Sequence, residues 1–244
     1  MAANRVVERY GARNVTLLCN NTRSEAPDWL TFVYESSKQM NARLVMLDEG
    51  LDIWELAFQQ GMIPNAFAGF CSRILKREPS LKWLNENCDK AYTTVHLGFD
   101  YTELHRLGGT LAFQKGWKCE TPLTWKPVID KEEILKELEC SSLPYPQAYE
   151  LGLQHNNCLK YGCVKGGQAY WKQVLEQVPE AYARSEELEE AFRSVYGDYA
   201  ILNRRHKGKG KALPLKVFRE QIEAGKEYDK SDYGSCSCFG DDGA

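Results

Sequence analysis

The pattern that most constrains the fold is a pair of short apolar runs separated by one amphipathic segment. The runs are VTLLC at residues 15–19 and ARLVML at residues 42–47, both rich in β-branched and aliphatic side chains. The segment between them, PDWLTFVYESSKQM, repeats apolar residues at helical spacing after Pro27 at its first turn. Strand, helix and strand in about 30 residues form a βαβ unit, which predicts a parallel sheet covered by helices.

Later segments extend this pattern and then replace it. TTVHLGF at residues 93–99 is a third predicted strand, and Pro79 is expected to divide two helical pieces. Beyond residue 121, the segments KEEILKELE, QAYWKQVLEQV and EELEEAFRSVY predict helices. The expected organisation is an α/β core over residues 1–120, a helical cysteine-containing region over 121–225 and a Gly/Cys tail over 226–244.

Composition narrows the class of protein. With 244 residues and 43% apolar content, the chain can bury a full core, and its net charge of -3 indicates no global affinity for nucleic acid or membranes. No apolar run is long enough to span a bilayer and the first residues lack a signal-peptide core, so we expect a cytoplasmic protein without a membrane partner. Nine cysteines, an odd number, favour reduced thiols or a metal site over a disulfide framework.

Five motifs occur in an order that resembles a known family. They are NNTRSEAP, CSRILKREP, LGFDYTELHR, TPLTWKP and NNCLKYGCVKGGQAYW. This set is similar to the phosphoadenosine phosphosulfate reductase family, in particular its phage and prophage branch, within the adenine nucleotide alpha-hydrolase-like superfamily. The resemblance implies an α/β fold with a doubly wound parallel sheet that binds ATP or phosphoadenosine phosphosulfate at the carboxyl ends of its strands. It also implies nucleotide-dependent sulfur chemistry, by sulfonucleotide reduction or sulfur transfer, with a reductant protein as partner.

One element of that family is missing. The Ser-Gly-Gly-x-x-Ser loop, which cradles phosphate between the first strand and first helix, has no counterpart in this sequence. We therefore expect the sheet to lack its first, central strand, with three explanations open: a gene start placed too late, a remnant of the enzyme, or a segment supplied by another chain. The alternative function is a catalytically impaired nucleotide- or nucleic-acid-binding remnant associated with a phage or mobile element.

Polar residues after the predicted strands are the candidates for nucleotide binding. Asn20 and Thr22 follow the first strand and have side chains that can bind ribose or phosphate, although Thr22 or Ser24 would equally cap the helix near Pro27. The family pattern gives Glu25 a contact with substrate, and a carboxylate near a helix start is also favoured by the helix dipole.

Two further segments offer anion-binding groups. In GFDYTELHR, Arg106 is the candidate for holding phosphate or sulfate, and Glu103 belongs to the same motif, whereas Asp100 departs from the basic residue usual in the family. Lys165 and Gly166 precede a predicted helix, where backbone N–H groups either meet an anion or simply begin the helix.

Cys71 is the predicted catalytic residue. Arg73, Lys76 and Arg77 lie close to it in sequence, and nearby cations favour the thiolate. Arg73 is also a candidate anion ligand. The open alternative is a buried cysteine that packs at a helix start while the charges stay in solvent.

The cysteines of HNNCLKYGC have three interpretations. Cys158 and Cys163 are spaced too widely for most zinc knuckles, so zinc fits poorly. A four-cysteine site would need distant segments, and the resemblance implies an iron-sulfur cluster there, with these ligands: Cys71, Cys158, Cys163 and either Cys236 or Cys238. The alternatives are redox thiols that form a disulfide and ordinary structural cysteines.

A basic run, NRRHKGKGK at residues 203–211, is predicted to be a Gly-broken loop. Such a segment can bind nucleic-acid phosphates through Arg204 to Lys211, but a solvated loop without that partner is the favoured interpretation.

Overall fold

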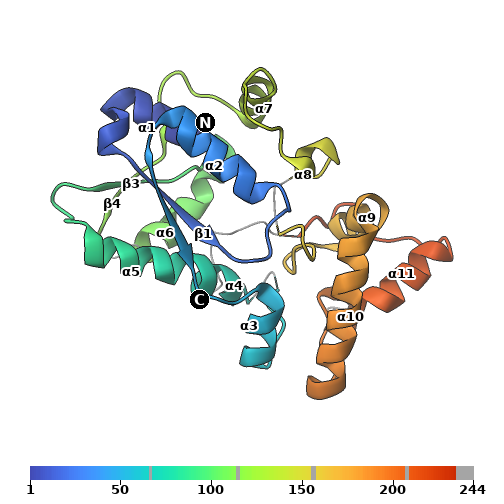
Figure 1. Ribbon diagram of the computed structural model, residues 1–244. Helices are drawn as coiled ribbons and strands as arrows, with labels where there is room; N and C mark the ends of the chain where they lie inside the picture. Colours follow the sequence, from blue (N-terminus) through green and yellow to red (C-terminus); the bar gives the residue numbers. More distant parts are fainter. Residues whose placement is uncertain (66–67, 114–115, 155–157, 207–208, 235–244) are drawn as a thin grey trace.

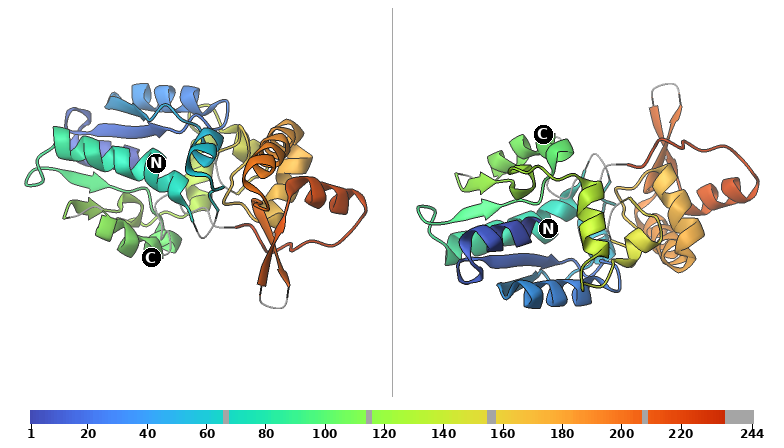
Figure 2. Two further views of the ribbon diagram at one scale, coloured as in Figure 1. Left: turned by 90° about the horizontal axis from the view of Figure 1, so that it is seen from below. Right: turned by 90° about the horizontal axis from the view of Figure 1, so that it is seen from above.

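The structure is a computed structural model that describes residues 1–65, 68–113, 116–154, 158–206 and 209–234. In these ranges the chain is a mixed α/β molecule (Figure 1). The strands and helices of the first half lie on one side, and the helices that follow residue 167 lie together on the other (Figure 2). None of the helices in the described ranges has the length and apolar content to cross a membrane.

The first half of the chain alternates helices and strands. Its elements are α1 (Ala2–Tyr10), η1 (Ala12–Asn14), β1 (Thr16–Asn21), α2 (Trp29–Met40), β2 (Arg43–Asp48), α3 (Ile53–Gln60), α4 (Phe70–Ser72), η2 (Arg73–Arg77), α5 (Glu78–Asn87), β3 (Thr94–His96), η3 (Tyr101–Arg106), α6 (Leu107–Phe113) and β4 (Lys118–Glu120). β1 and β2 pair in parallel, with Thr16 opposite Arg43 and Asn21 opposite Asp48. The predicted βαβ unit is therefore confirmed.

The strands do not form one continuous sheet. β3 and β4 form a second parallel pair, with Val95 opposite Cys119, and β4 has no counterpart among the predicted strands. The described strands make three separate two-stranded sheets, β1 with β2, β3 with β4, and an antiparallel pair later in the chain. The structure thus has the α/β class and the parallel pairing that the sequence predicts, without joining the two parallel pairs by hydrogen bonds.

The second half is mainly helical and includes one hairpin. Its elements are η4 (Pro122–Thr124), α7 (Lys131–Glu139), α8 (Gln147–Glu150), α9 (Gln168–Gln177), α10 (Pro179–Tyr196), β5 (Leu202–His206), β6 (Lys209–Leu213) and α11 (Leu215–Glu223). The predicted helices correspond to α7, α9 and α10. The predicted Gly-broken loop over residues 203–211 is wrong, because β5 and β6 pair antiparallel along their full length.

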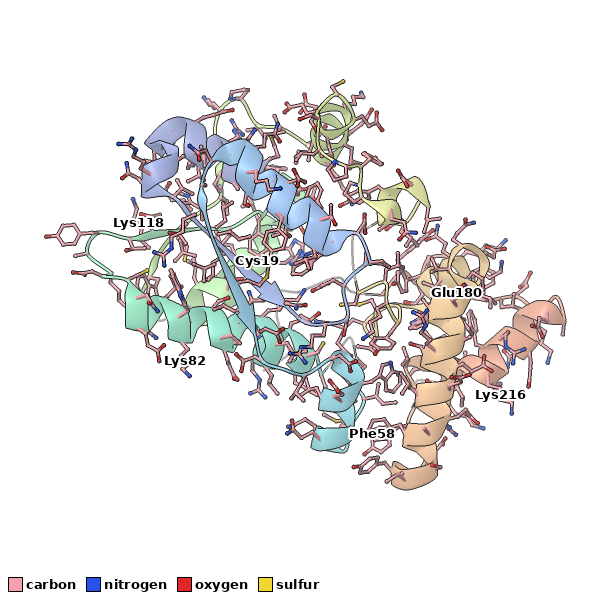
Figure 3. All side chains as sticks on the ribbon, viewed as in Figure 1. Cys19, Phe58, Lys82, Lys118, Glu180 and Lys216 are labelled. Atoms are coloured by element: carbon pink, nitrogen blue, oxygen red, sulfur yellow. The ribbon has the colours of Figure 1, made fainter. Side chains whose placement is uncertain are left out.

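The hydrophobic core links the two halves. Its largest fully buried side chains include Trp54 of α3, Trp171 of α9 and Phe192 of α10. Phe58, on the side of α3 that faces α10, has its ring centroid 5.3 Å from that of Phe192 (Figure 3). Each such side chain contributes about 1.5–3 kcal/mol through removal of apolar surface from water. The contact between α3 and the last helices therefore fixes the second half of the chain to the first.

The helical segment after Gly69 differs from its predicted form. Instead of breaking at Pro79, the helical backbone runs without interruption from α4 through the π-helical η2 into α5. Pro79 lies within this continuous helical run, two residues after the end of η2. The prediction of two divided helices is wrong in this respect, because the π-helical hydrogen bonds before Pro79 depart from the α-helical pattern that a proline interrupts.

Candidate functional site

A cluster of four polar side chains lies beyond the carboxyl end of β1. We call it the Glu25 cluster and define it as Thr22, Glu25, Lys76 and Cys158. The Thr22 hydroxyl donates to Glu25 Oε1 at 2.9 Å, and Lys76 Nζ lies 3.2 Å from the same oxygen. The Cys158 thiol donates to Glu25 Oε2 at 3.9 Å. The side chains of Glu25 and Lys76 are only 10% and 19% exposed, so this ion pair is largely shielded from water.

Segments far apart in the sequence meet at this cluster. Lys76 comes from η2, which packs against β1. Cys158 comes from a loop of the second half, and that loop is attached to the residues after β1 by two hydrogen bonds. The Lys160 N–H donates to the Ser24 carbonyl at 3.3 Å, and Lys160 Nζ donates to the Arg23 carbonyl at 3.2 Å. The cysteine loop therefore lies where ligands bind in open α/β sheets.

A second connection holds the same loop to α3. Asp52 is the N-cap of α3, and its Oδ1 accepts the N–H groups of Trp54 and Glu55, each at 2.9 Å. The other oxygen of Asp52 accepts the Tyr161 hydroxyl at 2.6 Å. Burial, and then the hydrogen bond to Asp52, raise the pKa of Tyr161, so this phenol remains a donor. Cys158 is thus positioned by ordered neighbours on the carboxyl-end side of β1.

The charge of Glu25 acts on thiols around it. Cys19, within β1 (Figure 3), has its pKa raised to about 11 by burial and next by Glu25, while Lys76 acts in the opposite direction. A carboxylate beside a thiol disfavours the thiolate unless the carboxylate takes the proton itself. Glu25 Oε2 is the atom within reach of the Cys158 proton, and Lys76 Nζ lies against the other oxygen of the same carboxylate.

Three of the cysteines that were predicted as cluster ligands lie within the described residues, and all three belong to the main hydrophobic core. Cys71, Cys158 and Cys163 are 7%, 7% and 9% exposed. In the part of the chain that the structure describes, no group of three or more His, Cys, Asp or Glu side chains is arranged to hold a metal ion. Cys236 and Cys238, the other predicted ligands, lie outside the described residues.

The predicted anion ligands around Arg106 lie outside the Glu25 cluster. Arg106 pairs with Glu103 within η3, and its guanidinium lies 4.9 Å from the Phe99 ring centroid. Asp100 caps η3 through its side chain, which accounts for an acidic residue at that position. An anion at Arg106 would have to compete with Glu103.

Asn20 and Arg73 also have protein partners. The Asn20 side-chain amide donates to the Ser80 hydroxyl at 2.9 Å and so joins β1 to α5. Arg73 is half exposed and lies 3.7 Å from Glu78. Neither contact involves the Glu25 cluster. Residues that the family motifs group as nucleotide or anion ligands therefore lie at different places in the structure.

The expectation that Thr22 or Ser24 caps α2 is wrong. Asp28 is the N-cap of α2, and no side chain caps that helix by a hydrogen bond. The hydroxyl of Ser24 donates to the Thr22 carbonyl at 3.1 Å and accepts the Ile53 N–H at 3.0 Å. Both hydroxyls are used inside the molecule, Thr22 in the Glu25 cluster and Ser24 as a link to α3.

The predicted anion contact at Lys165 and Gly166 lacks a free N–H at Gly166, which donates to the Cys163 carbonyl at 2.8 Å. Lys165 is 3% exposed, and Gly166 forms an antiparallel bridge with Gly234. At the start of α9, the Gln168 N–H donates to Asp232 Oδ2 at 3.1 Å. A carboxylate from residues 229–234 thus occupies the helix start, which favours negative charge.

Sequence reasoning missed the groups that hold the cluster together. The capping box Asp52-x-x-Glu55 was a readable signal for the start of α3. No local pattern marks Tyr161 or Lys160 as partners of Asp52 and Ser24, because those contacts depend on the path of a distant loop.

Comparison with protein-family models, with curated proteins and with solved structures found no match for this chain.

Proposed function

We propose that this chain is a phosphoadenosine phosphosulfate reductase-like protein and performs adenine-nucleotide-dependent sulfur chemistry at the Glu25 cluster. The observation that carries the proposal is the 3.9 Å contact between the Cys158 thiol and the Glu25 carboxylate, in a loop attached to the carboxyl end of β1. A thiol in contact with a base is one of the arrangements that activate a sulfur nucleophile, and the base here is itself paired with a lysine.

The strand pairing is consistent with the scaffold in this proposal. In a doubly wound sheet without its central strand, two parallel pairs would remain side by side without hydrogen bonds between them. β1 with β2 and β3 with β4 have this division. The proposal is that these pairs are the two halves of an adenine-nucleotide-binding sheet.

The chemistry follows from the contacts around Cys158. Glu25 accepts the thiol proton, and the Cys158 thiolate attacks the sulfonate sulfur of phosphoadenosine phosphosulfate. The bond between that sulfur and the phosphate oxygen breaks, and the adenosine bisphosphate leaves with the electron pair. Protonation of Glu25 weakens its ion pair with Lys76, whose ammonium is then available to the sulfonate oxygens.

A second thiol completes the reduction. A thiolate attacks the Cys158 Sγ of the S-sulfonate and forms a disulfide with it, and the bond from Sγ to the sulfonate sulfur breaks, so that sulfite leaves with the electron pair. Cys71, the predicted catalytic residue, and Cys163 are buried candidates for this thiol in the same core. A reductant protein with a dithiol then returns the disulfide to two thiols.

An iron-sulfur cluster stays a separate prediction. The described cysteines do not form a metal-binding group by themselves, so the steps above pass through no cluster. A four-cysteine site needs Cys236 or Cys238, and Gly234 is bridged to Gly166, three residues after Cys163.

The main test measures sulfite release and the covalent intermediate. The protein is incubated with phosphoadenosine phosphosulfate and dithiothreitol, and protein samples quenched without reductant are examined by mass spectrometry. We expect a cysteine S-sulfonate on Cys158 that is lost in Cys158→Ser and retained in Cys140→Ser, a control at an exposed cysteine. An S-sulfonate formed in equal yield in Cys158→Ser would refute the assignment of Cys158 as the nucleophile.

The cluster has its own test. An anaerobic preparation that contains an iron-sulfur cluster absorbs near 400 nm and contains iron. Loss of colour and iron in Cys163→Ser, but not in Cys88→Ser, would support cluster ligation. A colourless wild-type protein without iron would remove the cluster from the proposal and leave the thiol chemistry intact.

The alternative function is a nucleotide-binding remnant without catalysis, and the ion pairs of the candidate cations weigh against tight nucleotide binding under either function. Arg106, Arg73 and Lys76 each lie against a carboxylate, which a phosphate would have to displace. Calorimetric titration with ATP and phosphoadenosine phosphosulfate separates the two functions. Binding that weakens ~10- to 100-fold in Arg106→Ala, remains in Arg13→Ala and occurs without sulfite release would favour the remnant.

A further inference from the structure

Two arginines of α1 converge on one tryptophan. Arg5 Nη2 donates to the Trp125 carbonyl at 3.1 Å and to the Pro127 carbonyl at 2.7 Å. Arg9, one turn further along the helix, has its guanidinium carbon 4.4 Å from the centroid of the Trp125 ring. Across the described ranges, neither guanidinium forms an ion pair with a carboxylate. Two positive charges are therefore gathered beside Trp125 without a carboxylate from these ranges in contact.

Aromatic rings from three elements surround these charges. We call the group the Trp125 cluster and define it as Arg5, Arg9, Tyr10, His96 and Trp125. The ring centroids of Tyr10 and His96 lie 6.3 Å and 5.7 Å from that of Trp125 and 5.6 Å from each other. α1 packs against η4 and β3 (Figure 1), and Trp125 follows η4 directly while His96 is the last residue of β3. The cluster opens to solvent at Arg9 and at Tyr10, which is 41% exposed.

Two buried nitrogen atoms of the cluster have no hydrogen-bond partner among the described residues. They are Arg5 Nη1 and His96 Nδ1. Buried polar groups are normally hydrogen-bonded, and an N–H of a charged group without an acceptor carries a large desolvation cost. A ligand that accepts hydrogen bonds from Arg5 and His96 would remove that cost. Because one of the two donors is a guanidinium, an anion is the ligand that suits the pair best.

The charges around His96 also favour an anion. Glu120 lies opposite His96 in the strand register, but Lys118 Nζ is 2.9 Å from a Glu120 oxygen and compensates its charge. Burial lowers the pKa of His96, and Lys118 and Arg9 act in the same direction while Glu120 opposes them. The imidazole is therefore neutral near pH 7 and can still donate one N–H, while the arginines supply the positive charge.

We propose that the Trp125 cluster is a binding site for a phosphate group, held between the guanidinium groups of Arg5 and Arg9. Residues four apart on a helix have Cβ atoms about 5–6 Å apart, so a tetrahedral oxyanion can accept hydrogen bonds from both arginines. Side chains on a helix tilt toward its N-terminus, so Arg9 extends over the turn that carries Arg5. The inference is independent of the Glu25 cluster and of its thiols.

Arg9 is the mobile part of this site. It is exposed, and its contacts are with the rings of Tyr10 and Trp125. Contacts of this kind are weak at an exposed position, so an anion can displace the guanidinium from the ring at little cost and then be covered by it. Arg5, by contrast, is fixed by its two carbonyl acceptors.

The test is calorimetric titration with inorganic phosphate and with phenyl phosphate, at low ionic strength near neutral pH. We expect both compounds to bind, and Arg9→Gln to weaken both ~10- to 100-fold. If phenyl phosphate binds more tightly, the ligand is an aromatic phosphomonoester whose ring contacts Tyr10 and Trp125. Equal affinities identify free phosphate as the ligand. Either result supports the phosphate site.

Matched variants separate this site from other sources of affinity. Lys216→Gln makes the same change in net charge as Arg9→Gln, at an exposed position of α11 across the molecule from the α/β side (Figure 3), and should keep the wild-type affinity. Arg106→Ala should also keep it, which distinguishes this site from the proposed nucleotide contact. Arg5→Lys keeps the charge but loses the planar fork and should weaken binding ~10-fold. Circular dichroism melting identifies any variant that is unfolded.

Three outcomes would overturn the proposal. The first is no binding of either compound by the wild-type protein at millimolar concentration. The second is an equal loss of affinity in Arg9→Gln and Lys216→Gln, which would assign the binding to overall charge. The third is binding of acetate as tight as that of phosphate, which would assign the cluster to carboxylates.

Discussion

The molecule shields two carboxylates from water and gives them different neighbours. Glu25 lies beside a thiol and a lysine, and its side chain is 10% exposed. Glu189 is fully buried and accepts two backbone N–H groups. Burial raises the pKa of Glu189 to about 7, although the two N–H donors and Arg193 act in the opposite direction. Glu25 thus contacts a group that carries a proton, whereas Glu189 holds the residues at the two ends of the β5–β6 hairpin.

The comparison shows what distinguishes a reactive carboxylate from a structural one. Glu25 lies between a thiol and the ammonium group of Lys76, both of which are side chains. Glu189 accepts two backbone N–H groups, which do not give up their protons. Substitution at each carboxylate should therefore affect different properties, reactivity for Glu25 and free energy of unfolding for Glu189.

The largest expected effect comes from Glu189→Ala. It leaves the buried N–H groups of Ile201 and Leu215 without their acceptor and opens space in the core, so we expect a loss of about 3–5 kcal/mol in the free energy of unfolding. Urea unfolding followed by circular dichroism measures it. Glu190→Ala, at the exposed neighbouring position, is the control and should change stability by less than ~0.5 kcal/mol. Equal stability of the two variants would mean that the hydrogen bonds of Glu189 to Ile201 and Leu215 do not stabilise the fold.

The next effect is a dependence of stability on pH. Because the folded pKa of Glu189 is raised to about 7, the native state keeps a proton that the unfolded chain releases above its ordinary pKa of 4.5. Stability should therefore fall as pH rises between these values and level off above 7, by up to about 3 kcal/mol. Glu189→Gln has no proton to lose. If the difference between its unfolding free energy and that of wild type does not vary over this range, the explanation fails.

A smaller loss of stability is expected when Lys76, the cation paired with Glu25, is replaced. Lys76→Met leaves Glu25 without its ion-pair partner in a shielded place and should cost about 1–3 kcal/mol. It should also slow alkylation of Cys158 less than Glu25→Gln does, because only Glu25 takes the proton. Lys38→Met provides the comparison, since its pair with Glu35 is exposed on both sides. Indistinguishable unfolding midpoints for Lys76→Met and Lys38→Met would contradict the ranking.

The smallest expected effect concerns the loop that carries Cys158. Tyr161→Phe removes the hydroxyl that Asp52 accepts at 2.6 Å and should cost about 1 kcal/mol. Thermal unfolding measures this loss. Tyr92→Phe alters a phenol that is 90% exposed and should leave the melting temperature unchanged. A shift of the same size in both variants would show that the Asp52 contact does not hold the loop.

The sequence predicted the elements whose patterns are local. β1, α2 and β2 follow from two apolar runs and a helical repeat. The hairpin was missed because Lys and Gly are poor strand formers, and its pairing depends on an anchor in α10 that no local pattern marks. The hairpin conformation of that segment therefore depends on the tertiary hydrogen bonds of Glu189.

The candidate site was predictable only in part. Glu25, Thr22 and Cys158 were named from motifs, and the structure brings these three residues together. Arg73, Arg106 and Asn20 were named on the same grounds and lie with other partners. Spacing in a sequence places a residue after a strand, but the direction of its side chain depends on which neighbour competes for it.

Residues 229–234 support the start of α9, which matters for any shortened form of this protein. Asp232 accepts the Gln168 N–H through its side chain and the Ala169 N–H through its carbonyl. The first turn of α9 thus takes its acceptors from residues more than sixty positions later in the chain. Cleavage by a protease near Lys226 would leave those amides uncapped and loosen the helix that carries Trp171, so damage at the periphery would reach the centre of the protein.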